Sequence, residues 1–190
     1  MTSESDTAED GASDREQTDA GRTGVFVATS PAERQDAFAV RRAVFVDEQG
    51  VDEEIEWDEH DEPHAAATHF VAYDDGEPIG AARFRVPSVD TDSTGVNAAE
   101  TTAPTGKVER VAVAADRRGE GWGVRLMDAV EERAREDGFG HLTLHAQTRV
   151  RDFYERLGYI AHGDVFYEAG IPHVSMTKPL DGGTSASTRE

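Results

Sequence analysis

The chain has 190 residues and no cysteine, and its 39 Asp and Glu against 19 Lys and Arg give a formal net charge of −20. The length favours one domain with a sizeable core, and the missing cysteines exclude disulfides, thiolate chemistry and cysteine-ligated zinc. The sequence has neither an apolar run of about 18 residues nor a basic start followed by an apolar stretch, so we expect a soluble, cytoplasmic protein with no membrane partner.

The basic residues are unusual in kind as well as few. Only Lys107 and Lys178 are lysine, and the other 17 are arginine. An acidic, lysine-poor composition is typical of proteins from a halophile, and a surface that binds polycations is the alternative. Both interpretations argue against nucleic acid as a partner, because phosphates would be repelled.

The two ends of the chain have the composition of disordered tails. Residues 1–22 and 181–190 are rich in Ser, Thr, Asp, Glu and Gly, so the expected domain spans residues 23–180. Its first elements are a short strand from Val25 to Thr29 and a helix that runs to about Val46. The helix is predicted to begin at the capping box Ser30-Pro31-Ala32-Glu33, with proline at the first helical position.

An acidic run, a hairpin and a polar loop are predicted next. Eight of the eleven residues from Asp52 to Glu62 are acidic. The strands Ala67 to Tyr73 and Ile79 to Val86 are joined by Asp74-Asp75-Gly76-Glu77-Pro78, a hairpin connection. The polar residues 87–106 then form a long loop or insertion.

Three histidines and an aspartate near the end of this acidic run are candidate metal ligands, namely His60, Asp61, His64 and His69. The His-x-x-x-His spacing suits zinc on a helix, but Pro63 interrupts any helix across these residues. Acid-rich loops are also expected in a chain of this composition. We therefore predict no metal.

The segment from Val108 to Met127 has the pattern of a strand, a glycine-rich turn and the start of a helix. The helix is expected from about Trp122 to the cap at Asp137-Gly138, with one face formed by Gly123, Leu126, Met127, Val130 and Ala134. The N–H groups of its first turn have no partner within the helix, so they point at whatever lies over the glycines.

The turn has the chemistry of a phosphate site. Arg118-x-x-Gly121-x-Gly123 differs from the dinucleotide fingerprint and lacks the Gly-Lys-Ser/Thr of a nucleotide P-loop. Residues 117–125 carry three arginines and one glutamate, a positive segment in a chain of net charge −20, which favours an anion. The alternative is a tight strand-to-helix turn whose glycines serve only the backbone angles.

The remaining elements complete a mixed sheet. We expect a strand from His141 to Ala146, a helix from about Arg149 to Leu157 that ends at Gly158, and two strands between Ile160 and Lys178. A hairpin followed by β-α-β-α-β predicts an α/β (α+β) fold, with a mixed, mostly antiparallel central sheet flanked by helices.

Three segments together resemble the GNAT superfamily of acyl-CoA-dependent N-acetyltransferases, over about residues 25–180. They are Val111-Ala-Val113, Asp116-Arg-Arg-Gly-Glu-Gly-Trp-Gly123 and Phe153-Tyr-Glu-Arg-Leu-Gly-Tyr159. Val44-Phe-Val-Asp-Glu-Gln49 and Phe166-Tyr-Glu-Ala-Gly-Ile-Pro-His173 look like its ElaA-like branch. The resemblance implies the GNAT fold, acetyl-CoA as co-substrate, and cofactor contacts from Val111, Ala112, Val113, Arg118, Gly119, Gly121, Trp122, Gly123 and Val124.

The resemblance also implies roles in the chemistry. Tyr154 occupies the position of the family's tyrosine, which protonates the departing thiolate; the alternative is an ordinary core aromatic. Glu109 lies just before a presumed bulge and is the candidate base, although strand alternation, which puts it on the face of Val111 and Val113, also suits a salt-bridged residue. His173 is the competing candidate, with a structural role as its alternative.

The acceptor is an amine, either a small molecule or a peptide, whose identity the sequence does not give. Glu48, Gln49 and the acidic run from Asp52 are expected to border its cleft, or else to be solvated surface. The expected activity is acetyl transfer by direct attack, since no cysteine is present to carry an acyl-enzyme. A CoA-binding module without turnover is the alternative function, and a homodimer is left open.

Overall fold

The structure is a computed structural model that describes residues 21–87 and 103–180. The predicted tail 181–190, nearly all of the tail 1–22 and most of the predicted loop 87–106 lie outside these ranges. The elements are, in chain order, β1 (Gly24–Val27), α2 (Pro31–Arg41), the π-helix η1 (Arg42–Glu48), α3 (Glu53–Glu56), η2 (Glu59–Asp61), β2 (Ala67–Asp74), β3 (Glu77–Arg85), β4 (Thr105–Val113), η3 (Ala115–Arg117), α4 (Trp122–Glu136), β5 (His141–Gln147), η4 (Thr148–Val150), α5 (Arg151–Arg156), β6 (Ile160–Glu168) and β7 (Ile171–Pro179).

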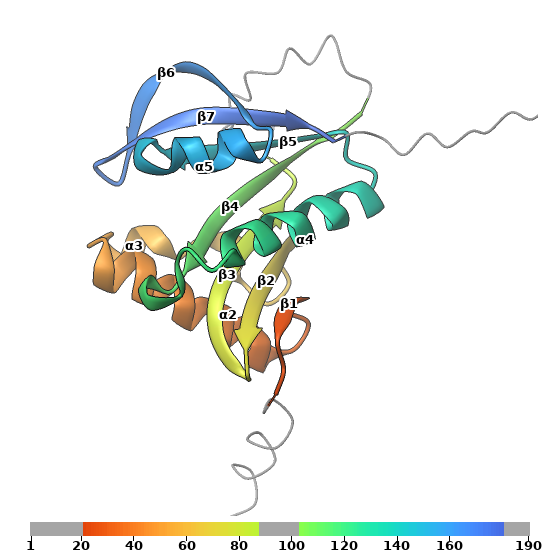
Figure 1. The fold of residues 1–190 in the computed structure, drawn as a ribbon, viewed down its shortest axis with the longest axis vertical. Helices are drawn as coiled ribbons and strands as arrows, with labels where there is room; N and C mark the ends of the chain where they lie inside the picture. The colour runs from red at the N-terminus through yellow and green to blue at the C-terminus, as the bar shows by residue number, and fades with distance from the viewer. Residues whose placement is uncertain (1–20, 88–102, 181–190) are drawn as a thin grey trace, which may run out of the picture.

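The strands form one seven-stranded sheet in the order β1-β2-β3-β4-β5-β7-β6 (Figure 1). Every neighbouring pair is antiparallel except β4 and β5, which are parallel. This confirms the predicted mixed, mostly antiparallel sheet flanked by helices. No helix in the described ranges has both the length and the apolar composition needed to cross a membrane.

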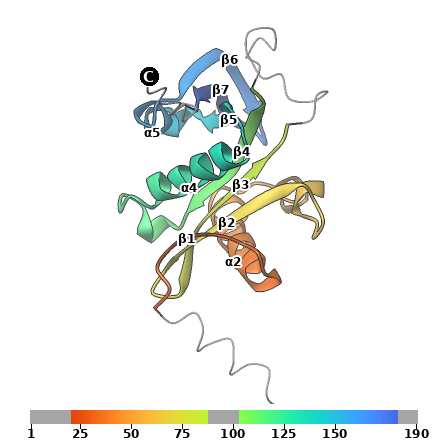
Figure 2. The same ribbon diagram turned by 90° about the vertical axis from the view of Figure 1, so that its right-hand side faces the viewer.

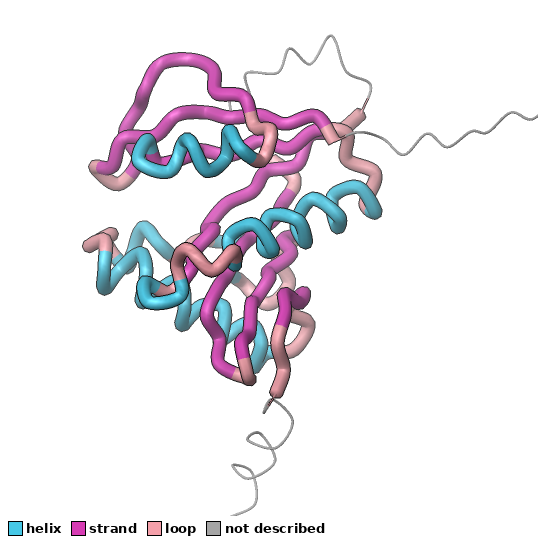
Figure 3. The backbone as a smooth tube through the Cα atoms, in the orientation of Figure 1, coloured by secondary structure: helices cyan, strands magenta, loops and turns pink. Residues whose placement is uncertain are grey.

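The sheet opens between β4 and β5. Their pairing runs only from Thr105 opposite His141 to Val108 opposite Leu144. Beyond it β4 continues to Val113 and β5 to Gln147, and the two strands diverge, as the tube in Figure 3 also shows. Within the described residues, the facing edges of both strands therefore carry backbone groups that no neighbouring strand satisfies.

A β-bulge marks the point where β4 turns away. Ala81 pairs with Ala112 and Arg83 with Glu109, so two residues of β4, Arg110 and Val111, lie opposite one residue of β3. Arg110 has φ of 54°, in the left-handed region that a side chain makes unfavourable. Holding a non-glycine residue there requires contacts from outside the strand.

The bulge also changes which residues share a face. Val111 and Val113 pack on the α4 side of the sheet, whereas Ala112 belongs to the cluster on the α2 side. Glu109 contacts Arg83, which also faces the α2 side. The expectation that Glu109 shares a face with Val111 and Val113 was therefore wrong, because the extra residue reverses the alternation.

Helices cover both faces of the sheet, and Figure 2 shows α2 and α4 on opposite sides. The larger core lies under α4 and α5, and the predicted helix face is confirmed since Leu126, Met127, Val130 and Ala134 are fully buried there. A smaller core joins α2 to the other face through Val40, Val44, Val71 and Tyr73.

The first helix begins where predicted but changes its form earlier. Ser30 Oγ accepts a hydrogen bond from the Glu33 N–H at 3.2 Å, and the Glu33 carboxylate accepts one from the Ser30 N–H at 2.9 Å, which confirms the capping box. After Arg41 the chain continues as the π-helix η1 to Glu48. A π-helix has wider turns than the α-helix expected to about Val46, and such segments are frequent at functional sites.

Two predicted boundaries were wrong. Strand β4 begins at Thr105, so the polar loop ends earlier than position 106. Arg22 does not belong to a tail: its guanidinium lies 3.9 Å from the centre of the Phe26 ring and its Nη2 lies 2.8 Å from Glu33 Oε1. The domain therefore begins at least one residue earlier than position 23.

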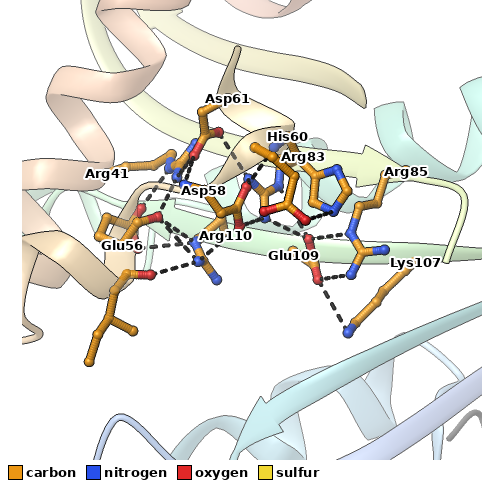
Figure 4. Close-up of polar contacts among 12 residues, drawn as sticks. Arg41, Glu56, Asp58, His60, Asp61, Arg83, Arg85, Lys107, Glu109 and Arg110 are labelled. Carbon is orange, nitrogen blue, oxygen red and sulfur yellow. Dashed lines mark hydrogen bonds and ion pairs between the residues drawn. The ribbon is translucent and has the colours of Figure 1, made fainter. Parts of the chain in front are cut away.

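A network of ion pairs holds the segment from α3 to η2 against the sheet (Figure 4). Arg41 of α2 binds Glu56 at 2.7 Å and Asp61 at 2.6 Å. Arg83 of β3 binds Asp58 at 2.7 Å and Asp61 at 2.9 Å. Both arginines are only 1% exposed, so each charge depends on its partners for the solvation it has lost.

The same network secures the bulge. Arg110 Nε lies 3.0 Å from Glu56 Oε2, and its Nη2 donates to the Glu56 carbonyl oxygen at 3.2 Å. These contacts tie the strained residue to α3. The acidic run from Asp52 is thus partly interior: Glu56, Asp58 and Asp61 are ion-pair partners, whereas Glu53, Glu54 and Glu59 are exposed.

Replacing Arg83 should be severely destabilising. We expect Arg83→Met to lower the free energy of unfolding by about 3 to 5 kcal/mol, because Asp58, Asp61 and Glu109 would each lose a buried countercharge. Arg42→Met is the matched control, since Arg42 pairs with Glu53 at the surface and both side chains are about half exposed; it should cost less than about 1 kcal/mol. Similar losses in urea denaturation of the two variants would contradict this account of the network.

The network also predicts an acid limit on stability. Burial raises the pKa of Asp61, but hydrogen bonding to Arg41 and the charges of Arg41 and Arg83 outweigh it and lower this pKa to about 2. The stabilisation is therefore complete above the unfolded pKa of about 4 and is lost as the pH falls toward 2. Unfolding free energies of the wild type and Asp61→Asn should differ at pH 7 by at least about 2 kcal/mol and converge below pH 4. A difference that stays constant from pH 7 to pH 3 would rule this linkage out.

Candidate functional site

The glycine-rich turn leads directly into α4. Gly119 has φ of 84° and Gly121, the residue before the helix, has φ of 88°. A side chain at either position would be strained, so the glycines are required by the backbone. No side chain of the described residues caps α4, and the N–H groups of Trp122, Gly123 and Val124 are left for an external acceptor. The positive end of the helix dipole adds to the attraction for an anion.

Arg118 lies beside this helix terminus and is held by Glu48. Its Nη1 and Nη2 donate to the two carboxylate oxygens of Glu48 at 2.7 and 2.6 Å, and its Nε donates to the Val113 carbonyl at 3.0 Å. This hydrogen-bonded pairing lowers the pKa of Glu48 and raises that of Arg118. The Arg118 side chain is 43% exposed, so a phosphate can reach it by replacing the Glu48 carboxylate as its partner.

The other predicted cofactor residues of the turn differ in exposure. Trp122 is 4% exposed and belongs to the core, with its Nε1 donating to Glu120 at 3.2 Å. At Gly123 an added Cβ would lie 3.1 Å from the Phe153 ring, so the absence of a side chain lets α4 and α5 pack closely. Val124 is 39% exposed. Trp122 and Gly123 therefore offer an anion their backbone, while Val124 also offers an accessible side chain.

Residues Val111 to Val113 form the edge of β4 along the opening. They begin at the second residue of the bulge and face no parallel partner in the described chain, since β5 has already diverged. An extended ligand with amide groups can pair with such an edge as another strand would. The turn and the helix terminus lie at the end of this edge, so the two binding features are continuous.

Tyr154 lies on α5, within the larger core. It is 8% exposed, with the Phe153 and Tyr159 rings edge-on to it at centroid distances of 4.9 and 5.8 Å. Burial raises the pKa of its hydroxyl above the ordinary tyrosine value. The hydroxyl is therefore protonated at neutral pH and is a weaker acid than an exposed tyrosine.

Glu109 is surrounded by cations, as Figure 4 shows. Its carboxylate oxygens lie 2.8 Å from Arg83 and from Arg85, and 3.2 Å from Lys107. Burial raises the pKa of Glu109, but these three cations outweigh it and hold the pKa well below the usual range. A carboxylate so placed has a low affinity for a proton, and this weakens Glu109 as a general base.

The donors considered for a metal have other partners. Both oxygens of Asp61 accept hydrogen bonds from Arg41, and Nε2 of His69 lies 3.2 Å from the His60 carbonyl oxygen. Among the residues of the two described ranges, no three His, Asp or Glu side chains are grouped as metal ligands would be.

The predicted acceptor residues connect the two sides of the opening. Glu48, at the end of η1, binds Arg118 beside α4, and Gln49 accepts a hydrogen bond from Gln147, at the end of β5, at 2.8 Å. Glu48 and Gln49 thus connect the turn that follows β4 with the end of β5. His173 of β7 is 8% exposed, and its Nδ1 donates to the Ile171 carbonyl at 2.8 Å.

A histidine and a glutamate that the sequence reasoning missed lie on the far side of the opening. Nδ1 of His145, on β5, is 2.7 Å from Oε1 of Glu168, on β6. Strand alternation could have identified His145: Leu142, Leu144 and Ala146 are buried under α4 and α5, so His145 and Gln147 point to the opposite face. No sequence pattern pairs His145 with Glu168, because the two residues lie on different strands, 23 positions apart.

Comparison with known proteins agrees with this geometry. The family model described as "Acetyltransferase (GNAT) domain" matches residues 28–180. BSU40680 of Bacillus subtilis, named as a candidate acetyltransferase, is 38% identical over 153 residues, covering 80% of this chain and 94% of that protein. YjcF of the same organism, named as an uncharacterized N-acetyltransferase, is 35% identical over 153 residues, covering 80% and 96%.

Solved structures share the fold. A candidate N-acetyltransferase from Lactobacillus plantarum superposes with a TM-score of 0.69 at 32% identity, covering 83% of this chain and 98% of that one. Escherichia coli ElaA superposes with a TM-score of 0.65 at 24% identity, covering 83% and 99%; this likeness shows a common fold. The opened sheet, the glycine turn and these matches together show that the chain belongs to the GNAT family of acetyltransferases.

Proposed function

We propose that this protein transfers an acetyl group from acetyl-CoA to a primary amine by direct attack of the amine on the thioester. The observation that carries the proposal is the continuity of the site. The unpaired edge of β4, the glycine turn and the uncapped start of α4 follow one another without interruption. A ligand with a diphosphate at one end and amides along its length matches that order.

The diphosphate would bind at the start of α4. The N–H groups from Gly119 to Val124 and the guanidinium of Arg118 supply hydrogen bonds and positive charge. Arg118 must exchange the Glu48 carboxylate for a phosphate. The exposed ion pair that is lost is worth only about 0.2 to 1 kcal/mol, less than the charge-assisted hydrogen bonds that replace it, at about 1.5 to 3 kcal/mol each.

The pantetheine arm would lie along Val111, Ala112 and Val113 and place the thioester beside the bulge. There a backbone N–H of the β4 edge can donate to the carbonyl oxygen as negative charge develops on it. The amine nitrogen forms a bond to the carbonyl carbon and the carbon–sulfur bond breaks. The departing thiolate takes the proton of the Tyr154 hydroxyl, the nitrogen loses one N–H proton, and the tyrosinate regains one from solvent, so that the products are an amide and free CoA.

The full sequence contains no cysteine to carry an acyl group, which is why direct attack is preferred over a cysteine acyl-enzyme. Glu48, Gln49 and His173 are proposed to border the acceptor. A thiol-release assay with acetyl-CoA and a panel of amines tests the activity, and mass spectrometry of the acylated amine confirms the product. The assay is run in low and in molar KCl, because the acidic composition predicts a dependence on salt.

The diphosphate assignment predicts opposite effects at two paired residues. Arg118→Gln should weaken acetyl-CoA binding about 10-fold to 100-fold in calorimetry, since one or more charge-assisted hydrogen bonds are lost. Glu48→Gln should strengthen binding by up to about 5-fold, because Arg118 is no longer held by a competing carboxylate.

Arg117→Gln is the matched control for Arg118→Gln. Arg117 is the neighbouring arginine, but it pairs with Asp74 and with Glu120, so its loss should leave affinity within about 3-fold, the change of a residue outside the contact. Equal affinities for wild type and Arg118→Gln would refute the assignment.

Tyr154→Phe tests the acid. Removing a proton donor should lower kcat by about 10²-fold to 10⁴-fold with little change in acetyl-CoA affinity, because the ring still fills its place in the core. Tyr159→Phe, which alters the neighbouring buried hydroxyl, is the control and should keep its turnover. If Tyr154→Phe turns over as fast as wild type, Tyr154 is a core residue only.

A further inference from the structure

The opening has a second titratable group placed for proton transfer, His145. It lies on β5 one residue after Leu144, where pairing with β4 ends. Glu109 has the same place on β4, directly after Val108, the partner of Leu144. His145 therefore lies at the point where the strands diverge, next to the bulge at which the thioester carbonyl is proposed to bind.

The face on which His145 lies is opposite to that of Tyr154. Its strand neighbours Leu144 and Ala146 pack with Tyr154 in the core under α4 and α5, so alternation directs His145 to the other side of the sheet. In the tetrahedral intermediate of acyl transfer the attacking nitrogen and the departing sulfur are two separate substituents of the carbonyl carbon, each of which can meet its own proton-transfer group. A proton donor under one face and an acceptor on the other match these two positions.

The imidazole is oriented as a base. Its Nδ1 lies 2.7 Å from Glu168 Oε1, and since a carboxylate accepts, Nδ1 carries a proton and Nε2 of the neutral ring presents a lone pair. In the described parts of the chain Nε2 has no hydrogen-bond partner. The His145 side chain is 22% exposed, and the Phe166 ring lies edge-on to it at 4.8 Å between centroids, which fixes its plane.

The charges around this pair keep Glu168 ionised. Burial raises the pKa of Glu168, but the hydrogen bond from His145 outweighs it, with Lys107 on β4 adding a positive charge, and the pKa is lowered. A carboxylate beside the imidazole stabilises the imidazolium that forms when Nε2 takes up a proton. Glu168 is thus a positioning residue for His145.

Other groups on this face are less suited to be the base. Glu109 is bound by three cations, and Glu48 is bound by Arg118. His173 is more buried, at 8% exposure, and its ring stacks on Phe166 at 6.2 Å, behind His145. His145 combines a carboxylate partner, an open Nε2 and the position next to the bulge.

We propose that His145, oriented by Glu168, is the base that takes the proton from the attacking amine; this inference rests on the proposed function. As the carbon–nitrogen bond forms, the amine N–H proton passes to Nε2. The carbon–sulfur bond breaks, and the thiolate takes the Tyr154 proton. The imidazolium then releases its proton to solvent and the tyrosinate regains one, so the net reaction is acetyl-CoA and amine to amide and CoA.

The test uses the full chain with the amine that the wild type acylates fastest. His145→Gln should lower kcat/KM by about 10²-fold to 10⁴-fold while acetyl-CoA affinity and melting temperature stay near the wild-type values. The acidic limb of its kcat/KM profile should be less steep than that of the wild type, because only protonation of the amine itself then remains. Ser175→Ala is the matched control: Ser175 pairs with His145 across β5 and β7, and its loss should change kcat/KM by less than about 3-fold.

Glu168→Gln provides a second readout if His145→Gln does not fold. It should lower kcat/KM and move the acidic limb to lower pH, because a neutral amide stabilises the imidazolium less; Glu168→Asp should recover part of the loss. Wild-type activity that survives in His145→Gln with its acidic limb intact, or an unshifted limb in Glu168→Gln, overturns the base assignment alone. A wild type that releases no CoA with any amine overturns the proposed function and this inference with it.

Discussion

The parallel pairing between β4 and β5 ends after Val108 and Leu144, and it ends because β4 bulges at Arg110. A left-handed conformation at a residue with a side chain costs about 1 to 2 kcal/mol. Contacts from Glu56 to Arg110 offset that cost, and Glu56 is in turn held by Arg41. The opening between the strands thus depends on a buried charge network on one face of the sheet, and the backbone edge that it exposes is the feature an amide-bearing cofactor can use.

The charged residues near the site are ion-pair partners within this network. Arg83, Arg85 and Lys107 all surround Glu109. The glutamate that resemblance favours as a base is consequently the centre of an electrostatic cluster. The base that we propose for the amine proton is instead His145 on β5, which is hydrogen-bonded to Glu168. In the proposed reaction, Tyr154 and His145 therefore act on the thioester from opposite faces of one opened sheet.

Local patterns predicted much of the fold. The capping box at Ser30, the glycine turn before Trp122 and the buried face of α4 depend on residues a few positions apart, and each was found where expected. The bulge was placed close to its position only through family resemblance, because an arginine in a left-handed conformation leaves no local signature. The pairs Glu48 with Arg118 and His145 with Glu168 join residues far apart in sequence, and only the folded sheet brings them together. Only the folded sheet likewise brings Arg83 and Arg85 to Glu109. Strand alternation placed Glu109 itself on the wrong face.

The central claim is that the opening between β4 and β5 is the cofactor site, with its anion-binding end at α4. A crystal structure of the protein with bound acetyl-CoA tests this most directly. The account predicts the diphosphate on the N–H groups of residues 119–124, Arg118 turned from Glu48 to a phosphate, and the pantetheine arm paired with Val111 to Val113. A cofactor whose phosphates lie on another element, with the Arg118–Glu48 pair intact and the β4 edge unoccupied, would contradict it.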